Sequence, residues 1–290
     1  MKRILITGAG SYLGKSLADY LGQWPEEFQV EAISVRDDSW KNVDFHGFDA
    51  IYHTAALVHM AQNKQDPAQA EAYDRVNTRL PLAIAEKAKS QGVGQFVFLS
   101  TAAIYGCAAP FGKTVTITAD TPAHPVDNYG ISKWKAEQYL RALADDSFRV
   151  AVLRPPMIYG KGCKGNYCAL EAMARKLPFF PAVSNQRSML YVGNLNELVR
   201  LLLQSGEGGI FWPQNREYVN TSQLVSRIAQ ARGRHLALIP GFGWALSLLR
   251  HMTPAVDKAF GSLCYDHALS QYSQDYCLWD FPASVLESER

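Results

Sequence analysis

The sequence predicts an α/β protein with a doubly wound parallel sheet and a smaller, mainly helical C-terminal lobe. Short apolar runs alternate with segments of helical periodicity through residues 1–155. These runs are apolar almost throughout, as in strands that are buried on both faces of a sheet. After residue 155 the chain becomes rich in Gly, Pro and aromatic residues, and its last part is mostly helical in pattern.

Each element follows from its local pattern. RILIT (3–7) predicts a strand, and YLGKSLADYL (12–21) repeats its apolar residues at helical spacing. Further strands are expected at 29–35, 48–55, 95–101 and 148–155, and helices at 70–91 and 129–144. A strand and a helix are expected again within 189–204, and helices from 223 onward with a break at 239–244. Strand–helix–strand repetition of this kind is typical of a doubly wound parallel sheet.

The change of character after Pro155 predicts two lobes. A chain of 290 residues is near the size at which one hydrophobic core divides. We expect residues 1–155 to form the first lobe, with 187–220 partly returning to it. Residues 156–186 and 221–290 are expected to form the second.

Composition excludes several classes of protein. Hydrophobic residues make up 48% of the chain, charged residues 19%, and the net charge is +2, so neither a nucleic-acid-binding stripe nor an acidic tail is expected. No signal peptide and no run of 18 apolar residues is found, which favours a cytoplasmic protein without a transmembrane segment. The five cysteines are expected to be reduced thiols, and no metal site is expected at Cys163 and Cys168, which lack further ligands nearby.

A glycine-rich turn lies between the first strand and the first helix. It contains Gly8, Gly10 and Gly14, with three further residues between them that we also assign to the site: Ser11, Tyr12 and Leu13. Glycines at this place let the backbone approach a pyrophosphate, which the N–H groups and dipole at the helix start then stabilise. The turn therefore predicts a dinucleotide-binding lobe of the Rossmann type.

The end of the second strand bears on which dinucleotide is bound. Val35 is followed by Arg36, Asp37 and Asp38. An acidic residue there would bind the ribose 2′-hydroxyl of NAD, whereas an arginine would suit the 2′-phosphate of NADP. The sequence leaves both open and favours NAD slightly.

Tyr129 and Lys133 stand four residues apart at the start of a predicted helix, in DNYGISKWKAE. Residues at this spacing share a helix face, so the ammonium can lie near the phenol. A nearby cation favours the phenolate and would lower the pKa of the tyrosine from its usual value near 10. The pair thus predicts a general base, although two solvent-facing side chains would give the same spacing.

An ordered series of segments makes the chain resemble the extended short-chain dehydrogenase/reductases. The series comprises ITGAGSYLG, FDAIYHTAA, QFVFLSTAAIYG, the Tyr129–Lys133 helix, LRPPMIYG and RSMLYVGNL, and it covers about residues 1–220. The nearest group is the UDP-glucose 4-epimerase-like part of the NAD-dependent epimerase/dehydratase family. Ser11 departs from the pattern, because the family usually has a glycine there.

The resemblance implies roles for individual residues. Thr101, Tyr129 and Lys133 would be catalytic, with Thr101 aligning the sugar oxygen that Tyr129 deprotonates. Lys133 would also bind the nicotinamide ribose. Beyond the glycine turn and Arg36, the cofactor would contact Ala55 and Pro155. Asn166 and Arg187 would bind the diphosphate of a nucleotide sugar. Asn77, Arg154 and His53 are expected to be structural.

The resemblance leaves the reaction open. Ala102 and Ala103 occupy the places of the Asp-Glu pair of family dehydratases, so elimination of water is not expected. A 4-epimerase acting through a transient 4-keto sugar and an NADPH-dependent 4-keto sugar reductase would use the same three catalytic residues. We favour the epimerase. A non-catalytic relative would have little use for Tyr129 and Lys133.

The stretch 239–263 departs most from the family. Its aromatic and aliphatic residues recur at helical spacing, which is typical of core packing or of a dimer contact. A shallow membrane association, suited to a lipid-linked diphosphosugar, is the alternative. A homodimer is the expected assembly.

Overall fold

A computed structural model describes residues 1–58, 67–253 and 255–290. The chain divides into two compact units. The first unit comprises residues 1–106, 122–155 and 196–212, and the second comprises 107–121, 156–195 and 213–290. The returning segment of the first unit is thus 196–212, shorter than the predicted 187–220, and residues 107–121 leave the first unit for the second.

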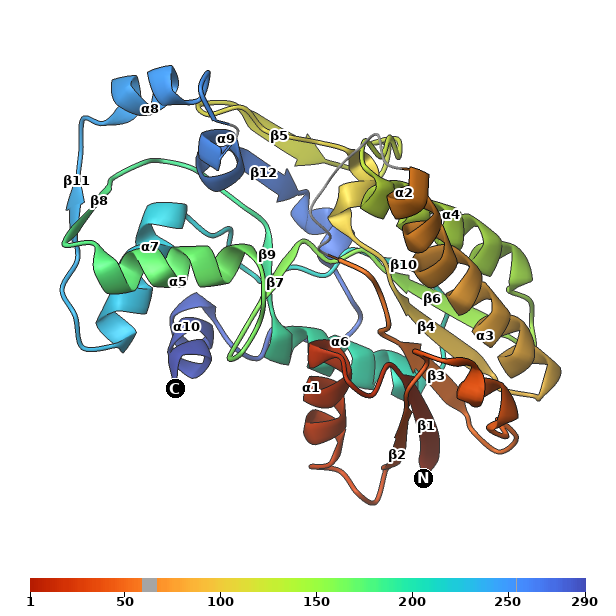
Figure 1. Ribbon diagram of the computed structural model, residues 1–290. Coiled ribbons are helices and arrows are strands. Elements are labelled where there is room, and N and C mark those ends of the chain that lie inside the picture. Colours follow the sequence, from red (N-terminus) through yellow and green to blue (C-terminus); the bar gives the residue numbers. More distant parts are fainter. Residues whose placement is uncertain (59–66, 254) are drawn as a thin grey trace. The chain divides into compact units, whose positions relative to one another are not determined.

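The first unit is built on a six-stranded parallel sheet (Figure 1). Its strands lie in the order β10-β6-β4-β3-β1-β2. Their bounds are β1 (Lys2–Thr7), β2 (Phe28–Ile33), β3 (Ala50–His53), β4 (Gln95–Leu99), β6 (Arg149–Leu153) and β10 (Gly209–Phe211). The predicted α/β class with a parallel sheet is confirmed.

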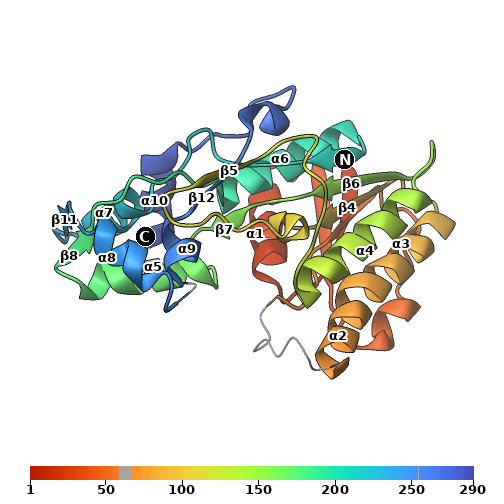
Figure 2. The ribbon, with the colours of Figure 1, turned by 90° about the horizontal axis from the view of Figure 1, so that it is seen from above.

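Helices cover both faces of this sheet. They are α1 (Tyr12–Leu21), α2 (Pro67–Asp74), α3 (Leu80–Ser90), α4 (Asn128–Leu143) and the part of α6 (Val192–Ser205) from residue 196. Figure 2 shows α1 and α6 on one side of the strands and α2, α3 and α4 on the other. Hydrogen bonds join α6 to α1: the Tyr20 hydroxyl donates to Glu197 Oε2 at 2.9 Å, and Asn196 Nδ2 donates to Ser16 Oγ at 2.8 Å and to the Ser16 carbonyl at 3.2 Å.

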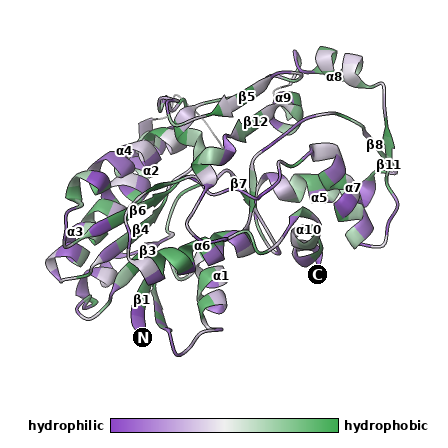
Figure 3. Cartoon of the chain, turned by 180° about the vertical axis from the view of Figure 1, so that it is seen from behind, coloured by the Kyte–Doolittle hydropathy of each residue, from purple (hydrophilic) through white to green (hydrophobic). Residues whose placement is uncertain are grey.

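Burial explains the apolar strands. Leu5, Ile51, Phe96 and Val152 each have no exposed surface, since helices cover the sheet on both sides. Much of α6 is green in Figure 3, and its Leu198, Val199 and Leu202 are buried. The hydrophobic runs that predicted strands therefore reflect this double cover.

Two features of the first unit differ from the sequence pattern. The predicted helix 70–91 is α2 and α3 with a π-helical turn, η2 (Arg75–Arg79), between them. The edge strand β10 was not predicted, because it has three residues and begins at Gly209, whose φ is +133°. Its place is fixed by pairing with β6, which no local pattern shows.

The second unit combines helices with short strand pairs. Its helices are α5 (Asn166–Lys176), α7 (Thr221–Ala231), α8 (Gly243–Leu249), α9 (Ala255–Phe260) and α10 (Phe281–Glu289). Its strands are β5 (Thr114–Ile117), β7 (Met157–Tyr159), β8 (Phe179–Pro181), β9 (Met189–Tyr191), β11 (Ala237–Ile239) and β12 (Ser262–Tyr265). They pair in parallel as β5 with β12, β7 with β9, and β8 with β11.

The strand pairing explains the membership of residues 107–121. β5 pairs with β12 in register from Thr114 opposite Ser262, far along the chain. Such a contact has no signature in the local sequence. Within the described residues, no helix has the length and apolar character to cross a bilayer.

Candidate active site

The glycine turn lies at the point where the strand order of the sheet reverses. β1 is flanked by β2 on one side and β3 on the other, so the chain crosses over β1 between them. Ligands of doubly wound sheets bind at the carboxyl ends of such strands. Gly8 follows β1 with φ +117°, and a Cβ there would lie 2.7 Å from Thr54 Oγ1 and 2.9 Å from the Ala55 nitrogen. Only glycine fits, and Ala55 lies at this edge; its contact with the cofactor stays a prediction.

Ser11 is the N-cap of α1, which explains its departure from the family pattern. Its φ is −77°, so the position needs no glycine, and its Oγ accepts from the Gly14 N–H at 2.9 Å. The same oxygen lies 2.6 Å from Thr54 Oγ1, across the turn. The N–H groups of Tyr12 and Leu13 belong to the first helical turn, where anions bind. The residues present therefore fit a pyrophosphate.

Arg36 stands beside the same turn. A Cβ on Gly10 would lie 3.4 Å from Arg36 Nη2. The carboxylate of the neighbouring Asp37 is engaged within the chain: it accepts a hydrogen bond from the Ser39 N–H at 3.0 Å and caps η1 (Asp38–Asn42). The side chain next to Gly10 is thus a cation, which fits a 2′-phosphate better than a 2′-hydroxyl.

Helix α4 carries Tyr129 in its first turn and Lys133 one turn later. The helix begins where Asp127 accepts a hydrogen bond from the Gly130 N–H at 2.7 Å. The side chain of Thr101, which follows β4, is close enough to the Tyr129 hydroxyl to favour its phenolate. The structure thus brings Thr101 and Tyr129 together.

A close backbone contact positions this end of α4. A Cβ on Gly130 would lie 2.8 Å from the Ala103 carbonyl oxygen, in the turn η3 (Ala102–Tyr105). The Thr101 Oγ1 accepts from the Ala103 N–H at 3.1 Å, and the Ala102 N–H donates to the Pro155 carbonyl at 3.0 Å. Pro155 therefore lies at this edge of the sheet, tied to the turn that holds Thr101.

Lys133 is directed into the protein. Its side chain is 2% exposed, and its Nζ donates to the Leu99 carbonyl at 2.8 Å and lies 4.6 Å from the centre of the Phe98 ring. Burial lowers the pKa of Lys133 to about 7, and the negative charge of Glu137 opposes that shift. The Lys133 amine of the folded chain therefore titrates near neutral pH.

The pKa of Tyr129 differs in direction from the sequence-based expectation. Burial raises it to about 12, and the charges of Asp127 and Tyr73 act in the same direction. The side chain of Thr101 favours the phenolate and partly offsets this. Lys133 gives no such compensation in the chain alone, because its ammonium is itself disfavoured by burial.

A buried carboxylate links the three segments that meet at this edge. Glu137 is fully buried one turn after Lys133 and accepts from Arg154 Nη2 at 2.7 Å and Nε at 3.1 Å. It also accepts a short hydrogen bond from Ser100, the neighbour of Thr101. Arg154 Nη1 donates to the Tyr105 hydroxyl at 2.8 Å. The sequence analysis missed Glu137, whose i+4 spacing from Lys133 is the available signal.

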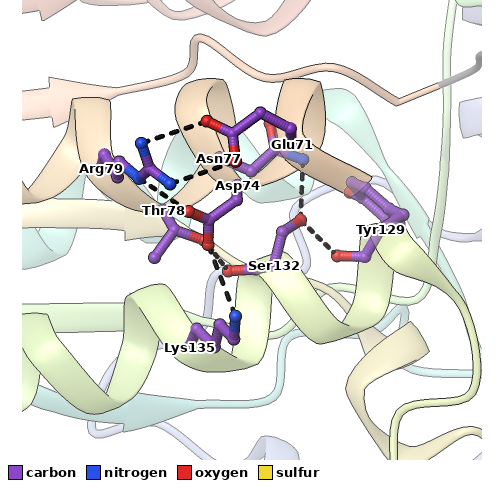
Figure 4. A network of polar contacts seen from close by, with 8 residues as sticks. All are labelled: Glu71, Asp74, Asn77, Thr78, Arg79, Tyr129, Ser132 and Lys135. Carbon is purple, nitrogen blue, oxygen red and sulfur yellow. Dashed lines mark hydrogen bonds and ion pairs between the residues drawn. The ribbon is translucent and has the colours of Figure 1, made fainter. Parts of the chain in front are cut away.

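Asn77 supports α4 from the opposite helix, out of the π-helical turn (Figure 4). It is fully buried, donates to Ser132 Oγ at 3.1 Å, and binds both the N–H and the carbonyl of Leu57, at 2.8 and 2.9 Å. Ser132 in turn donates to the Tyr129 carbonyl at 2.8 Å. Asn77 is thus a structural residue that holds the backbone of Tyr129.

His53 packs in the sheet. It has no exposed surface, and its Nδ1 lies 2.8 Å from Thr7 Oγ1. Burial, with the charge of Lys133, lowers its pKa to about 3, so the imidazole is neutral. Within the described part of the chain, no three His, Cys, Asp or Glu side chains gather in a way that could hold a metal ion.

The two predicted substrate residues lie in the second unit. Asn166 is exposed at the start of α5. Arg187 is partly buried, with its Nη1 donating to the Gly261 carbonyl at 3.0 Å, and burial lowers its pKa. Among the described residues, no carboxylate forms an ion pair with it, so its charge is available to an anion. Their roles toward substrate stay predictions.

Comparison with known proteins identifies the family. The sequence profile of the "NAD dependent epimerase/dehydratase family" matches residues 4–212, which is most of the chain. The protein belongs to this family. The resemblance read from the motifs is thereby confirmed.

Curated members of the family include sugar epimerases. The UDP-glucose 4-epimerase of Vibrio cholerae is 28% identical, over 99% of this chain and 93% of the relative. The N-acetyl-alpha-D-glucosaminyl-diphospho-ditrans,octacis-undecaprenol 4-epimerase of Escherichia coli O157:H7 is 29% identical, over 80% of this chain and 73% of the relative.

Solved structures share the fold and divide between two reactions. A dTDP-4-dehydrorhamnose reductase from Clostridium acetobutylicum has a TM-score of 0.75 at 18% identity, covering 99% of this chain and 98% of its own. A UDP-glucuronic acid 4-epimerase from Bacillus cereus, in complex with NAD, has a TM-score of 0.72 at 16% identity, covering 99% and 96%. The family member described here therefore has the fold of both epimerases and reductases.

The contact at Gly130 gives a first prediction. Replacing Gly130 by Ala places a methyl group against the Ala103 carbonyl, so α4 must move away from the turn that holds Thr101. Because small misplacements at reacting groups are costly, we expect kcat to fall at least about tenfold while the protein stays folded. Gly22→Ala is the control, since its φ is −59° and the nearest atoms are 3.4 Å from a Cβ. Full turnover by Gly130→Ala would contradict the role of this contact.

The buried amine gives a second prediction. Between pH 7 and pH 10 the unfolded chain carries a proton on Lys133 that the folded chain lacks, so the free energy of unfolding rises with pH in this window. The slope is at most about 1.4 kcal/mol per pH unit for one group.

Lys133→Met should remove this contribution. Urea unfolding of the nucleotide-free protein from pH 7 to pH 9 measures the difference in slope between wild type and variant. Lys135→Met, on the same helix with a half-exposed side chain, should keep the wild-type slope. Parallel curves for wild type and Lys133→Met would show that the amine is charged in the folded protein.

Proposed function

We propose that the protein is an NAD(P)-dependent nucleotide-sugar 4-epimerase of the UDP-hexose type, acting through a transient 4-keto sugar. The observation that carries the proposal is the close packing of Gly130, next to Tyr129, on the Ala103 carbonyl of the turn that Thr101 caps, on the same sheet edge as the glycine turn. The Vibrio cholerae relative, which matches nearly the full chain, is a UDP-glucose 4-epimerase and supports the choice.

In this mechanism Tyr129 moves a proton. Its phenolate would accept the proton of the sugar C4 hydroxyl while Thr101 hydrogen bonds the same oxygen. The bound nicotinamide supplies the hydride acceptor and a positive charge that favours the phenolate. Once the 4-keto sugar has turned over in the site, Tyr129 would return its proton to the C4 oxygen, so the epimerisation would involve no net redox change.

The burial of the site explains why the reaction needs positive charge near Tyr129. The chain alone raises the pKa of Tyr129 to about 12, so a phenolate at neutral pH requires additional positive charge. The Lys133 ammonium, which burial disfavours and Glu137 favours, would add to the charge of the bound nicotinamide. Elimination of water is not proposed, because Ala102 and Ala103 offer no acid or base.

On the substrate side, we assign Arg187 to the diphosphate. Its guanidinium is partly buried, makes a single carbonyl contact at Gly261, and suits phosphate oxygens. Asn166, exposed at the start of α5, would add an amide hydrogen bond to the same group. The Escherichia coli relative is named for a sugar on undecaprenyl diphosphate, so lipid-linked diphosphosugars belong among the substrates to be tested.

A second candidate is a 4-keto sugar reductase that uses NADPH. The observation that favours it is Arg36 beside Gly10, with Asp37 engaged in capping η1. An arginine at this place binds a 2′-phosphate. A reductase would exchange its dinucleotide at every turnover, whereas an epimerase would retain it.

One assay separates the two candidates. The purified protein is incubated with UDP-glucose, UDP-galactose and their N-acetyl forms, without added dinucleotide, and the products are resolved by chromatography. Interconversion supports the epimerase, and denatured protein should then release NAD or NADP. Turnover only of a 4-keto sugar, with NADPH consumed, supports the reductase.

Tyr129→Phe tests the residue common to both reactions. Loss of the hydroxyl should lower turnover by about 10²–10⁴-fold, as expected for removal of an acid–base group, while dinucleotide binding is kept. Tyr139→Phe is the matched control, since Tyr139 is exposed on the same helix. Near-normal turnover by Tyr129→Phe would overturn its assignment.

Arg36→Gln tests the dinucleotide preference. Loss of a charge-assisted contact to the 2′-phosphate should weaken NADPH binding by about 10–100-fold and change NADH binding little. Isothermal titration with each dinucleotide measures both. Arg149→Gln, a half-exposed arginine paired with Asp146, is the control. An equal loss for both dinucleotides would assign Arg36 a role outside phosphate recognition.

A further inference from the structure

Helix α8 exposes a stripe of large apolar side chains. Trp244, Leu248 and Met252 recur at a spacing of four and are 75%, 67% and 81% exposed. Leu246, on the other side of the helix, is buried. Residues at this spacing share one face of a helix and its continuation. The protein therefore packs one side of α8 and leaves the opposite side bare.

The stripe is the main apolar exposure of the described residues. Apart from Met1, no other large hydrophobic side chain among them is more than 55% exposed. Three neighbours in sequence extend the patch at lower exposure: Ile239, Phe242 and Leu249. Figure 1 shows α8 at the outer edge of its unit, next to α9. Contiguous apolar exposure of this kind marks an interaction surface.

The segment that carries the stripe is rich in positive charge, although Arg232 within it pairs with Glu171 and Glu289. Residues 218–256 contain four arginines and no aspartate or glutamate. Arg250 pairs with Asp257 at 3.2 Å, whereas Arg234 and Lys258 are exposed and form no ion pair with a described carboxylate. Arg175 and Lys176 add two exposed cations at the end of α5 in the same unit. The complement of such a surface is negative.

The size and composition of the stripe favour a membrane over a second copy of the chain. A stable protein interface buries roughly 800 Å² on each partner, and three side chains on one short helix and the turn after it fall well short of this. A second copy would also bring the same cations together. A short helix and the turn after it, with exposed Trp, Leu and Met at a spacing of four and cations without an ion pair in the same segment, are suited to the boundary of a bilayer.

We propose that Trp244, Leu248 and Met252 form a docking surface for an anionic membrane. Helix α8 lies in the plane of the headgroups, its apolar stripe enters the acyl boundary, and Arg234 and Lys258 face anionic headgroups. The stretch 239–263, for which the sequence left packing, dimerisation and membrane contact open, thus contains a surface for peripheral binding. Residue 254 of that stretch lies outside the described residues.

Co-sedimentation with vesicles tests the proposal. The full-length protein is mixed with vesicles of phosphatidylcholine alone or of phosphatidylcholine with phosphatidylglycerol. We expect binding to the anionic vesicles that weakens as salt is raised, and much weaker binding to the neutral ones. A triple variant, Trp244→Ser, Leu248→Ser and Met252→Ser, should bind anionic vesicles at least about tenfold more weakly.

Two controls keep the outcomes distinct. Leu278→Ser removes another exposed apolar side chain of the same unit and should leave vesicle binding unchanged. Tyr129→Phe should bind vesicles like wild type, so failure of the proposed reaction and failure of the docking surface are measured separately. Sedimentation velocity reports the oligomeric state of wild type and triple variant.

Three results would overturn the proposal. The proposal is wrong if the wild-type protein does not sediment with anionic vesicles. It is also wrong if the triple variant binds them as tightly as wild type. A dimer that the triple variant converts to monomer, with no vesicle binding by either, would assign the stripe to a second copy instead. The variant's circular dichroism and thermal unfolding, compared with wild type, show that any loss is not due to misfolding.

Discussion

The buried ion pair between Glu137 and Arg154 is the interaction on which the candidate site depends. One carboxylate holds α4 through its own backbone, the end of β4 through Ser100, and the end of β6 through Arg154. Removing one partner of such a pair leaves an uncompensated buried charge and costs roughly 3–5 kcal/mol. An apolar replacement of both Glu137 and Arg154 could fold as well. We therefore infer that the ion pair serves to align Thr101, Lys133 and Pro155.

The same cluster sets the electrostatics of the site. The charge of Glu137 favours the ammonium of Lys133, while burial acts against it. Tyr129 is held by Thr101 on one side and by the Asn77–Ser132 network on its backbone, with its pKa raised by burial. The chain thus fixes the position of the phenol and favours its protonated form. We propose that the charge of the bound nicotinamide, together with Lys133, releases that proton.

Much of this arrangement could be predicted from the sequence, because local patterns carry it. The apolar runs predicted β1, β3, β4 and β6, and the glycine turn predicted a βα unit with Gly8 at a position that admits no side chain. The spacing of Tyr129 and Lys133 placed them on one face of α4. Long-range contacts were beyond the sequence: the pairing of β5 with β12, the edge strand β10, and the buried partners of Glu137. The direction of the pKa shift at Tyr129 depends on burial, which no motif reports.

The central claim is that positive charge from the bound nicotinamide and Lys133 lowers the pKa of Tyr129. Carbon-13 labelling of the tyrosine Cζ atoms allows its titration to be followed by NMR, with the Tyr129 signal assigned by its absence in Tyr129→Phe. The account predicts no titration of this signal below about pH 10 in the free protein, and titration at clearly lower pH with the oxidised dinucleotide bound. Lys133→Met should abolish part of that change. A Tyr129 signal that titrates at the same pH with and without the dinucleotide would contradict this claim.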